Sequence, residues 1–218
     1  CMNIFHIRLN AVVKRFVLAD LVWLAGWGLL SPIFAVFVLE QIPGATVVTI
    51  GTAAAVYWIL KSIIQIPVAL AIDRTASERD DYLVLVVSLM LAGLTSFSYI
   101  LVHTVAQLYL VEVLHAVSFA LYIPSWNGIF TRHLDPEHRA LEFALDSGAV
   151  GIATGIAGLL GSIVMQAFGF QVIFIATAVL SFAAAIIIFN SPSIIFPRHR
   201  TTRGDLFAAD HTPRNLGK

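Results

Sequence analysis

Six long apolar runs, separated by short polar segments, make up most of the chain. Each run is close to the ~20 residues that an α-helix needs to cross a ~30 Å hydrocarbon core at ~1.5 Å per residue. The pattern predicts an all-α integral membrane protein with a six-span membrane domain over residues 16–190. The predicted transmembrane helices cover about 16–39, 46–72, 82–102, 106–130, 143–168 and 170–189.

Composition agrees with this pattern, because 59% of the residues are hydrophobic and only 12% are charged. These fractions lie outside the range of soluble globular domains. The first run is longer than the ~7–15-residue apolar core of a secretory signal, and it contains Asp20. We therefore expect it to remain as a span. The single cysteine excludes a disulfide within one chain.

The distribution of basic residues predicts the orientation. Twelve of the 13 Lys and Arg residues lie at the chain ends or in alternate loops, and the other loops have none. Short loops rich in Lys and Arg stay on the cytoplasmic side, so we expect a cytoplasmic (inner) membrane protein with both termini cytoplasmic. Because no basic block is interleaved with aromatic residues, nucleic acid is not an expected partner. The basic segments are the N-terminal segment 1–15, the loops 73–82 and 131–142, and the tail 191–218.

The polarity of the spans repeats along the chain. The first and second spans carry ionisable residues and the third has none, and the fourth, fifth and sixth follow the same order. Repeats of three spans with inverted topology are a known way to build membrane transporters. The order therefore favours two three-helix inverted repeats.

Lys61 lies within the second span, with Tyr57 and Gln65 one turn away on the same helical face. A lysine at membrane depth is costly unless it meets a partner, water or a ligand, so it marks a functional site. Its candidate partners are Asp20, Asp146 and an anionic ligand.

Polar and aromatic residues also share one face of the first span and one face of the fourth, at intervals of three and four. These faces either line a solvated cavity or pack against neighbouring helices with their polar tips satisfied. Glu112 and His115 either carry a proton or form a hydrogen-bonded pair that does not titrate. Pro32 ends the polar face of the first span and indicates a bend. The predicted substrate and ion pathway consists of Asp20, Trp23, Trp27, Tyr57, Lys61, Gln65, Glu112, His115, Tyr122 and Trp126.

Glycines follow one side of the fifth span. Without a Cβ they let helix backbones approach closely, and small residues at this spacing are enriched at membrane helix contacts. We expect them to serve helix packing. The residues concerned are Gly148, Gly151, Gly155 and Gly158.

The loop after the second span, ALAIDRTASER at 69–79, resembles the cytoplasmic signature Gly-x-x-x-Asp-Arg-x-Gly-x-x-Arg of the major facilitator superfamily. Alanine stands at both glycine positions. The fifth span also resembles that family's antiporter motif, but Ile156 replaces its proline, so antiport is not inferred. The resemblance covers about residues 14–190. It implies a cytoplasmic gate, to which we assign Asp73, Arg74, Arg79, Arg139 and Asp146.

Members of that family typically have twelve spans in two six-span halves. The resemblance therefore implies half of such a fold, acting as a secondary transporter of a small solute by alternating access, with the proton as a candidate coupling ion. A second copy would complete the transporter as a homodimer, since closed two-fold symmetry is the commonest oligomer form. The alternatives are a subunit that needs a different second half, a gene fragment, and a non-transporting membrane sensor or assembly module.

Enzyme activity is not expected. The chain has no Gly-x-x-x-x-Gly-Lys loop for ATP and no Gly-x-Ser-Gly site of a rhomboid-like protease. The seven histidines are scattered, so no metal site and no cofactor are predicted.

Overall fold

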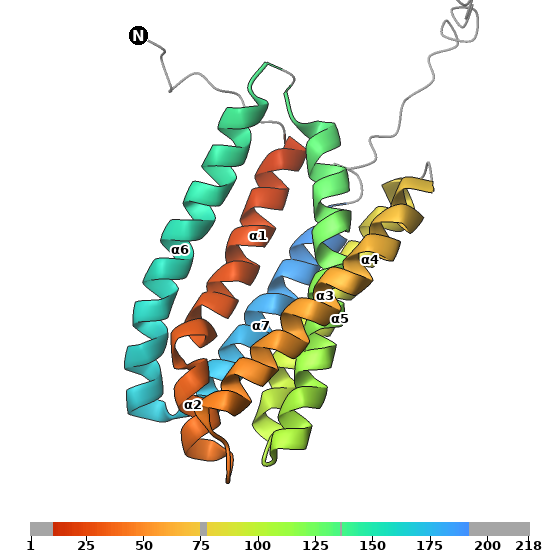
Figure 1. Cartoon of the computed structure of the whole chain (residues 1–218). Coiled ribbons are helices and arrows are strands. Elements are labelled where there is room, and N and C mark those ends of the chain that lie inside the picture. The colour runs from red at the N-terminus through yellow and green to blue at the C-terminus, as the bar shows by residue number, and fades with distance from the viewer. Residues whose placement is uncertain (1–10, 75–77, 136, 192–218) are drawn as a thin grey trace, which may run out of the picture.

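The computed structural model describes residues 11–74, 78–135 and 137–191, and every regular element in these ranges is helical (Figure 1). The segments predicted at 1–15 and 191–218 lie mostly outside the described residues. The elements are α1 (Ala11–Leu30), η2 (Ser31–Ile33), α2 (Phe34–Gln41), α3 (Val47–Arg74), α4 (Glu78–Ser98), η3 (Tyr99–Leu101), α5 (Val105–His133), α6 (Arg139–Phe168) and α7 (Phe170–Phe189).

Five described helices are long and apolar enough to cross a membrane, and the number is six if α1 and α2 form one span. These two helices meet at an angle of 41°. The break between them is the short 3₁₀ turn η2, which contains Pro32. Proline lacks the N–H that an α-helix needs, so it accounts for the bend that the sequence predicts there. The all-α membrane fold is confirmed.

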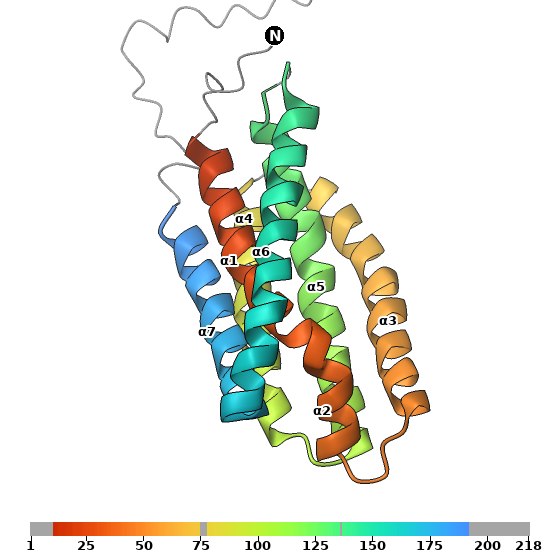
Figure 2. The same cartoon turned by 90° about the vertical axis from the view of Figure 1, so that its left-hand side faces the viewer.

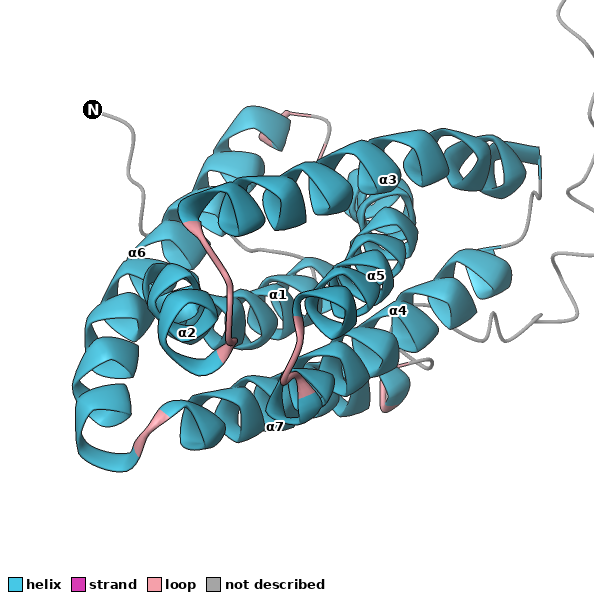
Figure 3. Ribbon diagram, turned by 60° about the horizontal axis from the view of Figure 1, so that its bottom comes forward, coloured by secondary structure: helices cyan, strands magenta, loops and turns pink. Residues whose placement is uncertain are grey.

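The helices pack in a pattern that repeats. α1 packs along α6 and α7, α5 packs along α3 and α4, and α4 packs along α7. Exchanging α1 with α5, α3 with α6 and α4 with α7 leaves this set of pairs unchanged. Figures 2 and 3 show α1 and α5 within the bundle, with α7 and α4 on the side opposite α3. Two three-helix units therefore pack as equivalent repeats, as the order of polar spans predicts.

α3 and α6 stand at the two ends of this packed series and are the most exposed helices. In the most apolar 18-residue stretch of each of these helices only 11% of the residues are buried, compared with 44% in the corresponding stretches of α4 and α7. Large apolar side chains such as Ile63 and Ile66 on α3 and Ile152 and Leu159 on α6 are exposed. Lipid or another protein must cover these surfaces.

Close approach of α1 and α6 depends on two glycines. A Cβ on Gly28 would lie 2.9 Å from the backbone of Thr154, and a Cβ on Gly161 would lie 2.4 Å from the carbonyl oxygen of Leu29. Gly158 also faces α1, with Gly28 O at 3.5 Å from its added Cβ. The other three glycines predicted to serve helix packing have no close neighbour among the described residues, because a Cβ there would meet nothing within 4 Å. These three are Gly148, Gly151 and Gly155.

Candidate functional site

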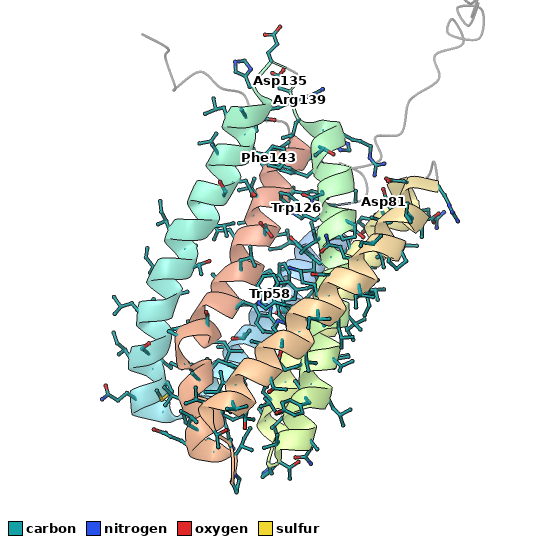
Figure 4. All side chains as sticks on the ribbon, in the orientation of Figure 1. Trp58, Asp81, Trp126, Asp135, Arg139 and Phe143 are labelled. Carbon is teal, nitrogen blue, oxygen red and sulfur yellow. The ribbon has the colours of Figure 1, made fainter. Side chains whose placement is uncertain are left out.

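A cavity of about 330 Å³ lies between α1, α3 and α5 near the middle of the bundle, and the described residues leave it open. Figure 4 labels Trp58 from its rim, on α3 at about half the height of the bundle. Six of the eleven residues that line the cavity are phenylalanine, tyrosine or tryptophan. The lining consists of Trp27, Leu30, Ser31, Phe34, Ala54, Tyr57, Trp58, Tyr99, Glu112, His115 and Phe119.

Glu112 is the acidic group of this cavity, and each of its carboxylate oxygens has a hydrogen-bond partner. Its Oε1 accepts a hydrogen bond from the Tyr99 hydroxyl at 2.7 Å. Its Oε2 lies 3.2 Å from Nδ1 of His115, one turn later on α5. Tyr99 is itself buried and comes from η3, at the end of α4. The hydrogen bonds therefore fix the carboxylate at the back of the cavity.

An aromatic stack joins the three helices that line the cavity. The His115 ring lies between the rings of Trp27 and Tyr57, with centroid distances of 4.2 Å on each side. The Trp27 ring is nearly parallel to the imidazole, with 7° between the planes, and the Tyr57 ring is tilted by 30°. Phe119 meets His115 edge-on at 4.9 Å. The interhelical contact is thus carried by ring faces and not by ion pairs.

Lys61 is buried, and its ammonium lies against aromatic rings. Nζ is 4.4 Å from the centroid of Trp58 and 5.7 Å from that of Tyr57. Among the described side chains it forms no salt bridge, so pairing with Asp20 or Asp146 is not what the structure shows. Cations are attracted to the face of a tryptophan within about 6 Å of its centroid.

A second acidic site lies closer to the end of the bundle that carries the α3–α4 and α5–α6 turns, which is the predicted cytoplasmic end. The Tyr122 hydroxyl on α5 donates to Oδ1 of Asp20 on α1, and both side chains are buried. The Trp23 ring packs on Tyr122 with centroids 3.9 Å apart. Asp146 on α6 is buried nearby and interacts electrostatically with Asp20. Oδ1 of Asp146 has no hydrogen-bond partner in the described part of the chain.

Most of the predicted pathway residues therefore separate into two sites, and Trp126 and Gln65 belong to neither. Trp27, Tyr57 and His115 belong to the Glu112 cavity, with Lys61 beside it, and Trp23 belongs to the Asp20 site. Trp126 is buried and stacks on Phe130 at 4.2 Å, closer to the predicted cytoplasmic end. Gln65 lines neither site. It faces a separate groove of about 350 Å³ between α3 and α5, which Asp73 also lines.

The predicted cytoplasmic gate does not form one group. Asp73, Arg74 and Arg79 are exposed and form no ion pair with a described side chain, and Asp146 belongs to the Asp20 site. Figure 4 places Arg139 at the α5–α6 turn, away from Asp81 on α4. The three signature residues and Arg139 lie at helix ends, where no described residue packs over them.

The ion pair at this end joins Asp81 on α4 to Arg132 on α5, and the sequence analysis did not select either residue. Nη2 of Arg132 donates to Oδ2 of Asp81, whose side chain is 0% exposed. Oδ1 of Asp81 has no partner among the described residues. The sequence does hint at this pair, since Asp81 directly precedes the apolar run 82–102 and Arg132 follows the apolar run 106–130.

The α5–α6 turn is held by local hydrogen bonds. The backbone N–H of Asp135 donates to Oε2 of the buried Glu142 at 3.0 Å. The backbone N–H of Glu137 and the His138 ring lower the pKa of the Asp135 carboxyl below its usual value. The start of α6 is therefore anchored to the end of α5.

Comparison with known proteins identifies the family to which this chain belongs. No curated protein matches the chain. Residues 17–212 match the family model described as Major Facilitator Superfamily, and the match covers most of the sequence and includes all or most of every long helix. With its apolar helices and repeated three-helix packing, the chain belongs to the major facilitator superfamily, a family of secondary transporters of the membrane.

Proposed function

We propose that this chain is a half-size secondary transporter that moves a small solute by alternating access and acts as a homodimer. The observation that carries the proposal is the cavity between α1, α3 and α5, where polar and aromatic groups at membrane depth gather on an open side of the bundle. Binding sites of transporters built from repeats lie near the bilayer midplane, between the repeats.

A companion half follows from the two exposed edge helices. α3 and α6 each leave an apolar surface uncovered, and α3 carries one wall of the cavity. A second copy related by a two-fold axis along the membrane normal would bring matching edges together and close the cavity. A different second half would do the same, so the dimer is tested separately from transport.

Three groups have roles in the proposed cycle. Glu112 with His115 and, at another depth, Asp20 are the candidates for proton coupling, since ionisable groups within spans mark proton and substrate pathways. The pair of Asp81 and Arg132 is the candidate latch at the predicted cytoplasmic end, in place of the exposed signature residues. The proposed location is the inner membrane with both termini cytoplasmic, because of the basic loops.

Reconstitution into liposomes tests this function. We expect gradient-driven uptake of at least one solute from a broad panel, loss of that uptake in Glu112→Gln, and unchanged uptake in Glu40→Gln. Glu40 is the matched control because it is an exposed carboxylate on α2 outside the cavity. Native mass measurement in mild detergent should give twice the mass of the chain. A monomer with no uptake would instead support a non-transporting sensor or a subunit of a heterodimer.

A further inference from the structure

The wall of the cavity is dominated by aromatic rings around a single acid. Among the described residues that line the cavity, Glu112 is the only Asp or Glu, and none is Lys or Arg. Aromatic rings present a negative face, so ring faces and a carboxylate both attract positive charge. The rings are those of Trp27, Phe34, Tyr57, Trp58, Tyr99 and Phe119.

Lys61 provides an independent observation on the same wall. Its ammonium lies against Trp58 at 4.4 Å and against Tyr57 at 5.7 Å, and both rings also line the cavity. These rings therefore already hold one cation, which is tethered to α3. A lysine side chain is long and flexible, so a free cation can take its place against the rings while the ammonium moves away.

The sign of the ligand charge follows from the groups that a ligand would meet first. An anion would face the Glu112 carboxylate and the negative faces of the rings, and the Lys61 ammonium beside the cavity is already engaged by two rings. A cation would be attracted by both. The volume of about 330 Å³ is at the lower end of the ~300–1,000 Å³ typical of ligand pockets. It suits an amine with one ring or a short apolar chain.

We propose that the cavity binds a small lipophilic organic cation, with its ammonium near Glu112 and against the faces of Tyr57 and Trp58. This inference rests on the proposed function only in identifying the bound molecule as the transported solute. Binding itself is measurable on purified protein without a gradient.

Isothermal titration calorimetry on the full chain in detergent tests the proposal with two probes. Benzyltrimethylammonium and benzylsulfonate share the benzyl group and carry permanent charges of opposite sign, so pH does not change either probe. We expect the cation to bind and the anion to bind at least about tenfold more weakly, because charge and ring faces act together.

Variants locate the site. Glu112→Gln should weaken binding of the cation by about tenfold, and Trp58→Leu by about three- to thirtyfold, as cation–π contacts do. Lys61→Met should strengthen it, since a competing ammonium is removed. Glu40→Gln should leave it unchanged. Trp58 is 58% exposed, so its replacement tests the site even where a change at Glu112 lowers the melting temperature.

Three results would overturn the proposal. They are equal binding of both probes, tighter binding of benzylsulfonate that disappears in Lys61→Met, and no binding of benzyltrimethylammonium at millimolar concentration. The second result would assign the cavity to an anion. Binding of the cation without any gradient-driven uptake would leave this inference standing and remove the proposed transport instead. Uptake of a solute in liposomes without binding of the cation would support the proposed transport and overturn this inference.

Discussion

Replacing Gly161 with alanine should separate α1 from α6 and destabilise the bundle. The added Cβ would lie 2.4 Å from the carbonyl oxygen and 2.9 Å from the Cα of Leu29, whereas ordinary contact begins at 3.4 Å. The neighbouring atoms belong to backbone, so no side-chain rotation relieves the clash. The two helices must move apart by roughly 1 Å, and overpacking of this kind costs about 1–3 kcal/mol.

Gly155 is the matched control on the same helix, because a Cβ there meets nothing within 4 Å. Gly155→Ala should be neutral within about 0.5 kcal/mol, or slightly stabilising, since alanine favours the helix. Unfolding of both variants in mixed detergent micelles, followed by far-UV circular dichroism, gives the two free energies. Equal stability of the two variants would refute the close approach of α1 and α6 at Gly161.

Three further substitutions test the polar contacts and the aromatic wall. Arg132→Ala should destabilise the protein by about 3 kcal/mol because it leaves the buried Asp81 carboxylate without its donor. Asp81→Asn should cost about 1 kcal/mol or less, because the Arg132 side chain is 41% exposed and reaches water. An unfolding titration in which Asp81→Asn is the more destabilising variant would contradict this. Tyr122→Phe removes the hydrogen bond to buried Asp20 and should cost about 1–3 kcal/mol in the same titration, and an unchanged midpoint would show that the bond is not made. Phe119→Ala should increase passive proton leak in liposomes that contain a pH-sensitive dye, and a leak equal to that of the parent protein would show that this ring does not separate the two acidic sites.

Much of the fold was predictable because lipid imposes a simple rule. A chain inside a bilayer must satisfy its own backbone hydrogen bonds, so long apolar runs become helices. The proline at position 32 likewise has a local effect on its own helix, and the bend appears where the sequence indicates it. The order of polar spans also carried information, because it reflects which helices occupy equivalent places in the two repeats.

The contacts within the site were less predictable, because they depend on how separate helices meet. The partner of Glu112 is Tyr99, which reaches it from η3 across a helix–helix contact. Asp81 and Arg132 are likewise 51 positions apart and meet only because α4 packs on α5. Trp58 was within reach of sequence reasoning, since it precedes Lys61 by three positions and so shares its face.

The two acidic residues of the predicted pathway, Glu112 and Asp20, lie in separate sites, and in each site the carboxylate is bound by a tyrosine hydroxyl. Glu112 accepts from the hydroxyl of Tyr99, and Asp20 accepts from the hydroxyl of Tyr122. The ring of Phe119 lies between them, 4.6 Å from the ring of Trp23 on the Asp20 side and 4.9 Å from the His115 ring on the other. Hydrocarbon rings offer a proton or a cation no hydrogen-bonding route. In the proposed cycle, a proton or cation could pass between the two sites only if this ring moved aside.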